Sequence, residues 1–246
     1  MLNYILPLIL PLLNIVGEKS EICQRIVYRE AKYIVCNFHP QENDIRLFYS
    51  DAANGNVLRS FSRLEEMLER TNEGLLFAMN AGMYHRDMSP VGLYVEDGKE
   101  VAPLITNGGW GNFHLLPNGV FYLKDGKAAV KETLAYQKAN LLPDYASQSG
   151  PMLVIDGKLH PKFLPDSDSL KIRNGVGVRE DGTVFFAISE DRVRFYDFGL
   201  LFKEHLNTPN ALYFDGTISS LFVPEMSRMD RLFPMGPMVA VVKKRK

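Results

Sequence analysis

The sequence predicts an α+β fold, a single β-rich domain of antiparallel hairpins with a few helices. Asp-Gly pairs between β-prone segments are the main signal, because both positions of a two-residue hairpin turn need positive φ. They occur at Asp97-Gly98, Asp125-Gly126, Asp156-Gly157 and Asp181-Gly182. Helical signals are few, and no linker or low-complexity segment divides the chain.

Three helices are expected. Ser62-Arg63-Leu64-Glu65 has the pattern of a capping box, and Leu64, Met67 and Leu68 then share one face until about 72–74. A second helix should begin near Asp197 and run through His205, and a third should cover 131–139.

The bulk composition excludes some function classes. Hydrophobic residues make up 46% of the 246 residues and charged residues 23%, which is ordinary for a globular protein. The net charge is −1, and basic residues are scattered apart from Lys243-Lys244-Arg245-Lys246, so we expect no nucleic-acid partner. The five histidines are isolated and there is no Cys-x-x-Cys, so no metal site and no cofactor are expected.

Residues 1–20 form an apolar leader. The stretch 2–16 is too short and too interrupted by proline for a spanning helix, but it has the length of a signal-peptide core. A buried N-terminal strand is the alternative, since no basic residue precedes it and no Ala-x-Ala pattern follows. We expect a periplasmic or secreted protein whose folded domain is 21–246, touching a membrane only through an uncleaved leader.

The two cysteines are consistent with export. Cys23 and Cys36 flank a segment that reads as a hairpin turning near Arg29-Glu30, which places the cysteines opposite each other at a non-hydrogen-bonded pair. That spacing suits a disulfide. Two buried thiols are the alternative and the commoner state in the cytosol. With the leader present, a Cys23–Cys36 disulfide is favoured.

Four polar-glycine clusters interrupt the predicted strands. They are Asn80-Ala81-Gly82-Met83, Ser149-Gly150-Pro151-Met152, Arg173-Asn174-Gly175-Val176-Gly177 and Asp215-Gly216-Thr217-Ile218-Ser219. Each combines a polar or charged side chain with glycine, which lets a ligand approach the backbone closely. An amide, a hydroxyl, a guanidinium and a carboxylate together suit a phosphorylated sugar.

Each cluster also has a plain structural interpretation. Asp215-Gly216 could be a fifth hairpin turn, Arg173 a surface arginine in a turn, and Asn80 a turn residue. Ser149 could be a hydrogen-bonding hydroxyl or a turn residue; Gly-x-Ser-x-Gly is absent. Trp110, in the glycine-rich stretch 107–113, could stack on a sugar or pack in the core.

Taken together, the four clusters resemble the phosphodiester glycosidase family, over roughly 22–242. The chain is most similar to the bacterial, exported branch. Ala81 and Thr217 stand where the eukaryotic pattern has glycine, so the eukaryotic substrate is not carried over.

The resemblance implies hydrolysis of a sugar-1-phosphodiester. Arg173 and Asn80, with backbone N–H groups of Gly82 and Gly150, would hold the phosphate, while Asp215 would stabilise positive charge at the anomeric carbon or activate water. The other expected substrate-binding residues are Ser149, Gly177, Gly216 and Ser219, and Glu190 is a candidate second carboxylate. A non-catalytic module that binds cell-wall glycan phosphates is the alternative.

Overall fold

The computed structural model of the chain describes residues 22–216 and 218–245. The expected leader, 1–20, lies outside the described residues, as does Thr217. Antiparallel strands dominate, and they form three sheets. This confirms the predicted α+β, β-rich class.

Sheet 1 has seven strands and contains the N-terminal hairpin. In spatial order it consists of β1 (Cys23–Tyr28), β2 (Ala31–Phe38), β13 (Val184–Ser189), β12 (Asn174–Val178), β14 (Asn210–Asp215), β10 (Met152–Ile155) and β11 (Lys158–Leu159). A bulge between β12 and β14 follows the pair Asn174–Asp215, so that Gly175 pairs with Tyr213. The two ends of this pair belong to different predicted clusters.

Sheets 2 and 3 have five strands each. Sheet 2 consists of β16 (Arg228–Met229), β15 (Leu221–Val223), β4 (Glu73–Asn80), β17 (Met238–Lys244) and β3 (Asp44–Phe48). Sheet 3 consists of β6 (Lys99–Ala102), β5 (Tyr94–Glu96), β9 (Tyr145–Ser149), β7 (Gly119–Lys124) and β8 (Lys127–Glu132).

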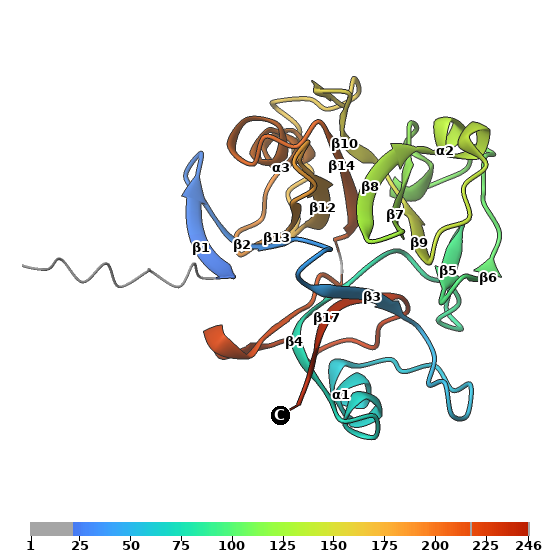
Figure 1. Cartoon of the computed structure of the whole chain (residues 1–246). Coiled ribbons are helices and arrows are strands. Elements are labelled where there is room, and N and C mark those ends of the chain that lie inside the picture. The colour runs from blue at the N-terminus through green and yellow to red at the C-terminus, as the bar shows by residue number, and fades with distance from the viewer. Residues whose placement is uncertain (1–21, 217, 246) are drawn as a thin grey trace, which may run out of the picture.

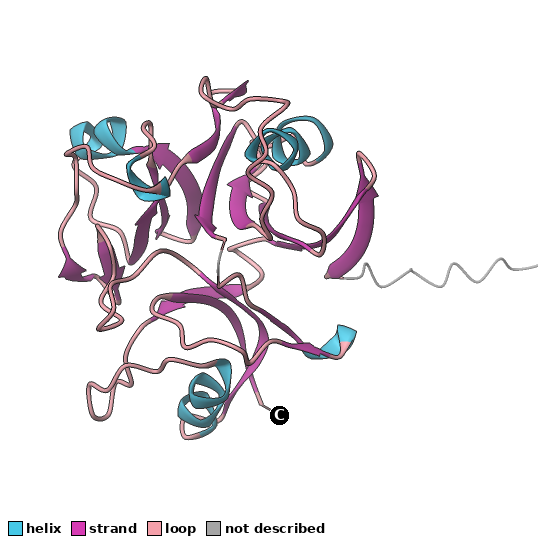
Figure 2. Cartoon of the chain, turned by 180° about the vertical axis from the view of Figure 1, so that it is seen from behind, coloured by secondary structure: helices cyan, strands magenta, loops and turns pink. Residues whose placement is uncertain are grey.

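The three sheets enclose one central core, and each is backed by a helix (Figures 1 and 2). Phe77 of sheet 2 and Phe121 of sheet 3 both contact the ring of Phe186 in sheet 1, with centroids 5.0 and 6.0 Å away. Such aromatic pairs add to the burial of apolar area that holds the sheets together.

The helices lie where the sequence places them. They are α1 (Phe61–Glu69), α2 (Thr133–Ala139), α3 (Phe195–Leu200), which continues as the π-helical turn η2 (Leu201–His205), and the 3₁₀ turns η1 (Asn112–His114) and η3 (Pro224–Met226). The cap of α1 is Ser60, whose hydroxyl accepts from the Arg63 N–H, so the predicted capping box at Ser62 was wrong by two residues. No helix within 22–216 and 218–245 has the length and apolarity to cross a membrane.

The four Asp-Gly hairpins are all present. At Asp97, Asp125 and Asp156 the aspartate and the following glycine both have positive φ, as the two-residue turn requires. The turn at Asp181-Gly182 differs, because only Gly182 has positive φ (88°) and the loop between β12 and β13 is longer. The prediction of two positive φ values was therefore wrong at that turn.

The disulfide is confirmed. Cys23 pairs with Cys36 across the β1–β2 hairpin, and their Cα atoms are 4.0 Å apart. The turn residues Arg29 and Glu30 both have positive φ, at 47° and 65°, a conformation that costs a non-glycine residue free energy. The covalent link therefore secures a hairpin whose own turn is unfavourable.

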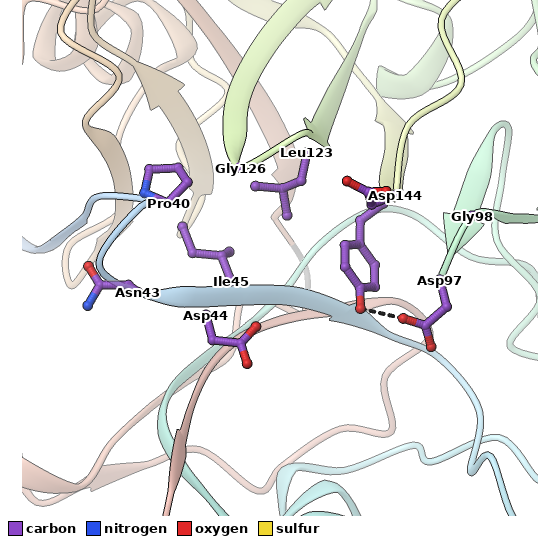
Figure 3. Close-up of a pocket in the computed structure, with 10 residues that line it drawn as sticks. Pro40, Asn43, Asp44, Ile45, Asp97, Gly98, Leu123, Gly126 and Asp144 are labelled. Atoms are coloured by element: carbon purple, nitrogen blue, oxygen red, sulfur yellow. Dashed lines mark hydrogen bonds between the residues drawn. The ribbon is translucent and has the colours of Figure 1, made fainter.

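A cavity of about 490 Å³ opens between β3 and the nearby ends of β7 and β9 (Figure 3). Asp97 accepts a hydrogen bond from the Tyr145 hydroxyl there. None of the four predicted clusters contributes to its lining. Tyr145 pairs with Leu123, whereas Ser149 pairs with Gly119 at the other end of the same two strands. The cavity and the predicted site therefore lie at opposite ends.

Reducing the Cys23–Cys36 bond should lower the free energy of unfolding by about 3 kcal/mol, since a short loop is no longer closed in the unfolded chain. Urea unfolding of the unmutated protein with and without reductant measures this and creates no core cavity. A midpoint that does not move with reductant would contradict the prediction.

Glu96 should make stability depend on pH. Burial raises the pKa of its carboxyl from 4.5 to about 7, although the Tyr94 hydroxyl and the Tyr49 N–H donate to it. The folded state therefore holds this proton more tightly, so the stabilisation is complete below pH 4.5 and is lost as pH rises through 7, by up to about 3 kcal/mol. Glu96→Gln should remove that fall between pH 5 and pH 8, whereas Glu100→Gln, on the exposed neighbouring strand, should keep it.

Candidate active site

Strand ends from all three sheets meet at the site. Asn80 ends β4 of sheet 2, Ser149 ends β9 of sheet 3, and Asp215 ends β14 of sheet 1, beside the start of β12 at Asn174. The Ser149 hydroxyl donates to the Phe214 carbonyl oxygen at 2.9 Å, which joins sheet 3 to sheet 1. All four predicted clusters thus converge, because Asn174, which pairs with Asp215, belongs to the cluster that begins at Arg173.

A pair of buried amides joins sheet 2 to sheet 1. The Asn174 Nδ2 donates to the Asn80 Oδ1 at 2.8 Å and to the Asn80 carbonyl oxygen at 3.0 Å. The Asn80 Oδ1 also accepts from the Ser220 N–H, while its Nδ2 is buried with no hydrogen-bond partner among the described residues. Asn80 lies in a strand and pairs with Met238, so the interpretation as a turn residue was wrong.

Asp215 is not a hairpin residue. The strand after it, β15, pairs with β4 and β16 in sheet 2, so the chain crosses between sheets at Asp215-Gly216. The Asp215 N–H donates to the Asn174 Oδ1 at 3.0 Å, and the Ser219 hydroxyl donates to the Asp215 carbonyl oxygen at 2.9 Å. The fifth-hairpin alternative is therefore wrong, and Ser219 holds the crossing in place.

Arg173 is fully buried, so the interpretation as a surface arginine was wrong. Its Cζ lies 3.5 Å from the centre of the Phe195 ring, its Nε donates to the Val193 carbonyl oxygen and its Nη2 to the Ser169 carbonyl oxygen. Its Nη1 is buried and has no hydrogen-bond partner in the described part of the chain. Burial lowers the pKa of this guanidinium from its usual value. One charge-assisted donor remains available for an anion.

Aromatic rings support the guanidinium from behind. His160 stacks on Phe163 at 4.6 Å, and Phe163 stacks on Phe195 at 5.0 Å, so Arg173 forms the end of a column of three rings. A cation over an aromatic face is stabilised, the more so when water is excluded. The column fixes the plane of the guanidinium and therefore the direction in which Nη1 points.

Tyr213 is a site residue that the sequence reasoning missed. Burial raises the pKa of its hydroxyl, the Asp215 charge raises it further, and Arg173 and Asn112 offset part of the rise. The Tyr213 ring lies 5.6 Å from the Arg173 Cζ, and its hydroxyl packs against Gly216, next to Asp215. The raised pKa keeps this hydroxyl protonated at neutral pH. The bulge pairs Tyr213 with Gly175, two residues after Arg173, and this pairing between distant segments left no signal in the sequence around Tyr213.

Tyr84 borders the same group. Burial raises the pKa of its hydroxyl to about 12, and the Asp215 charge adds to that rise. The hydroxyl donates to the Pro234 carbonyl oxygen, which holds the segment before β17 against the site. Nothing in the sequence around Tyr84 distinguished it from other tyrosines.

The predicted glycines serve close approaches of the backbone. A Cβ at Gly82 would lie 2.8 Å from the Ser147 hydroxyl oxygen, one at Gly150 would lie 2.7 Å from the Phe113 carbonyl oxygen, and one at Gly216 would collide with the Tyr213 hydroxyl. Gly177 is not brought to the others, since Thr208 and Phe202 occupy the space beside it.

Glu190 follows β13 and its carboxylate is held by two arginines. Arg25 donates to it through Nε at 2.7 Å and Nη2 at 3.0 Å, and the Arg228 Nη1 lies 3.5 Å away. These contacts join the N-terminal hairpin and β16, in two different sheets.

Trp110 is 97% exposed, so the interpretation as a core tryptophan was wrong.

Comparisons with known proteins identify the family. The family model for phosphodiester glycosidase matches residues 73–235, which contain all four clusters. The Escherichia coli (strain K12) protein YigE is 33% identical over 207 residues, covering 84% of this chain and 80% of YigE. Among solved structures, the catalytic domain of zebrafish N-acetylglucosamine-1-phosphodiester α-N-acetylglucosaminidase, auto-inhibited by its pro-peptide, has a TM-score of 0.64 at 12% identity, covering 91% of this chain and 84% of that one.

A Burkholderia pseudomallei protein whose name classes it as exported has a similar fold, with a TM-score of 0.52 at 11% identity over 86% of this chain and 74% of that one. At such identities the two structures show the shared fold alone. The sequence matches carry the assignment: this chain belongs to the phosphodiester glycosidase family.

Proposed function

We propose that the protein hydrolyses a sugar-1-phosphodiester at the site formed by Arg173, Tyr213 and Asp215. The observation that carries this is the buried guanidinium with an unpartnered Nη1 beside a tyrosine whose pKa responds to Asp215. A buried cation with a free donor suits an anionic oxygen. The family to which the chain belongs supports the same reaction.

In this proposal Arg173 and the Tyr213 hydroxyl donate to the phosphate. The ring column and the two backbone carbonyl oxygens hold the guanidinium plane, so little ordering is needed when the ligand binds. The Asn80 Nδ2 is a second buried donor without a partner among the residues described, on the sheet 2 side of the strand ends.

The bond that breaks joins the anomeric carbon to the phosphate oxygen. The phosphate monoester leaves with the electron pair and needs little protonation, because Arg173 already stabilises its charge. Water adds to the anomeric carbon and loses its proton, and Asp215 either accepts that proton or stabilises the oxocarbenium-like transition state. We assign Asp215 as the catalytic carboxylate, because it ends β14 next to the Tyr213 hydroxyl and its backbone is held by Asn174 and Ser219. Glu190 instead joins Arg25 and Arg228.

The proposed location is outside the cytoplasm, in the periplasm or beyond. The Cys23–Cys36 disulfide supports this, because such bonds persist in oxidising compartments.

Asp215→Asn should abolish turnover of α-linked N-acetylglucosamine phosphodiesters and teichoic-type polymers by the purified protein, because the amide neither accepts a proton nor carries the negative charge. Asp156→Asn is the matched control, since Asp156 occupies a true Asp-Gly hairpin in which asparagine is equally suitable. Tight binding of the diester by the unmutated protein without any product would instead assign a non-catalytic binding module.

Arg173→Lys should lower kcat/KM by ten- to a hundredfold, because it keeps the charge but loses the ring contact and the planar set of donors. One charge-assisted hydrogen bond contributes about 1.5–3 kcal/mol. Arg179→Lys is the control: Arg179 also stacks on a ring, Phe185 at 4.5 Å, and donates to a backbone carbonyl oxygen. Equal activity in both variants would remove Arg173 from the site.

Asn174 should behave as a positioning residue. Asn174→Ala removes the acceptor of the Asp215 N–H and the Nδ2 donor to the Asn80 oxygens, although the Asn80 Oδ1 keeps the Ser220 N–H. This should cost about 1–3 kcal/mol of stability. In a double-mutant cycle with Asn80→Ala the two losses should be non-additive by at least about 0.5 kcal/mol. Purely additive losses in urea unfolding would contradict the proposed link between the sheets.

A further inference from the structure

Three loops contact residues assigned to the site. We call 107–116, 160–171 and 229–236 the rim loops. The Phe113 carbonyl oxygen of the first packs against Gly150, where a Cβ would lie 2.7 Å from it. The Ser169 carbonyl oxygen of the second accepts from Arg173, and the Pro234 carbonyl oxygen of the third accepts from Tyr84. Each rim loop therefore touches a residue assigned to the site.

The rim loops carry most of the large hydrophobic side chains that lie exposed in the described part of the chain. These are Trp110 and Leu116 on the first, Leu164 and Leu170 on the second, and Met229, Leu232 and Phe233 on the third. Trp110 is 97% exposed and Leu232 is 86% exposed. The others, such as Val27, Val101, Leu134 and Leu142, are scattered over different elements.

The rim loops have no charge preference. Lys162 and Lys171 balance Asp166 and Asp168, Asp230 balances Arg231, and 107–116 contains no lysine, arginine, aspartate or glutamate. Such a rim offers little to a polyanionic or strongly polar partner. It suits a ligand that combines one negative charge, held by the buried Arg173, with an apolar group directly beside it.

We infer that the group on the far side of the phosphate is a hydrocarbon chain, so that the substrate is a sugar linked through phosphate to a lipid alcohol. This inference rests on the proposed function and specifies its substrate class. In this inference the sugar lies toward Asp215, the phosphate lies at Arg173 and Tyr213, and the chain extends toward the rim loops, which carry Trp110 and Leu232.

The test uses methyl alkyl phosphodiesters with chains of two to ten carbons, below their micelle concentrations, as non-sugar probes of the full chain in titration calorimetry. Affinity should rise with chain length in the unmutated protein, by up to about fourfold per methylene, which corresponds to ~0.8 kcal/mol for complete burial. The double variant Trp110→Ser, Leu232→Ser should bind the short diester normally but lose the dependence on chain length. Leu142→Ser, at a site 83% exposed away from the rim, is the matched control.

Arg173→Lys should weaken binding at every chain length, which shows that the probes do not simply adhere to the apolar leader. Normal binding of the short diester with no dependence on chain length would overturn the lipid inference and leave the phosphate site intact. No binding of any diester would instead overturn the proposed function. A dimer that the double variant dissociates, again without dependence on chain length, would assign the rim to a second copy of the chain and overturn the inference.

Discussion

The Asn174 side chain is the interaction on which the geometry of the site depends. Backbone groups at the ends of β4 and β14 belong to different sheets, so no ladder can join them. A side-chain amide has both a donor and an acceptor, and Asn174 uses one toward Asn80 and the other toward the Asp215 N–H. Because all three residues are buried or half-buried, a lost partner would leave a polar group without water, which is costly. The crossing at Asp215 is therefore fixed by the same bonds that hold two sheets together.

Whereas the buried polar groups of Asn174 are satisfied, the buried side chain of Arg173 keeps one donor without a partner among the described residues. A buried guanidinium is expensive unless its donors are satisfied. Here two donors bind backbone carbonyl oxygens and the charged plane lies on Phe195, yet Nη1 has no partner among the described residues. Residues that violate local rules in this way are typical of functional sites. Contact with the ring column lowers the free-energy cost of burying this cation. An anionic ligand bound at the unsatisfied Nη1 would offset the rest of that cost.

The sequence predicted what depends on nearby residues and missed what depends on distant ones. The Asp-Gly hairpins were predictable because turn chemistry is local, and the disulfide because register can be counted outward from a turn. Ser60 and Ser62 compete for one cap within two residues, which a pattern alone does not separate. Whether Asp215-Gly216 turned back or crossed between sheets depended on the pairing of β15 with β4, more than 130 positions earlier in the chain. A separation of 94 positions likewise hid the role of Asn174, whose partner is Asn80.

Arg173 and Asn174 are neighbours in the chain, and alternation along an extended backbone sends their side chains to opposite faces of sheet 1. The arginine enters the layer that contains Phe195 and Tyr213, while the amide faces Asn80 of sheet 2. A shift of β12 by one residue would exchange the two and destroy both the anion site and the junction of the sheets. The bulge between β12 and β14 adds a further constraint, because it lets Tyr213 remain beside Arg173 while Asp215 still pairs with Asn174. One dipeptide thus couples the position of the phosphate donor to that of the carboxylate, so neither can move independently while the sheets stay joined.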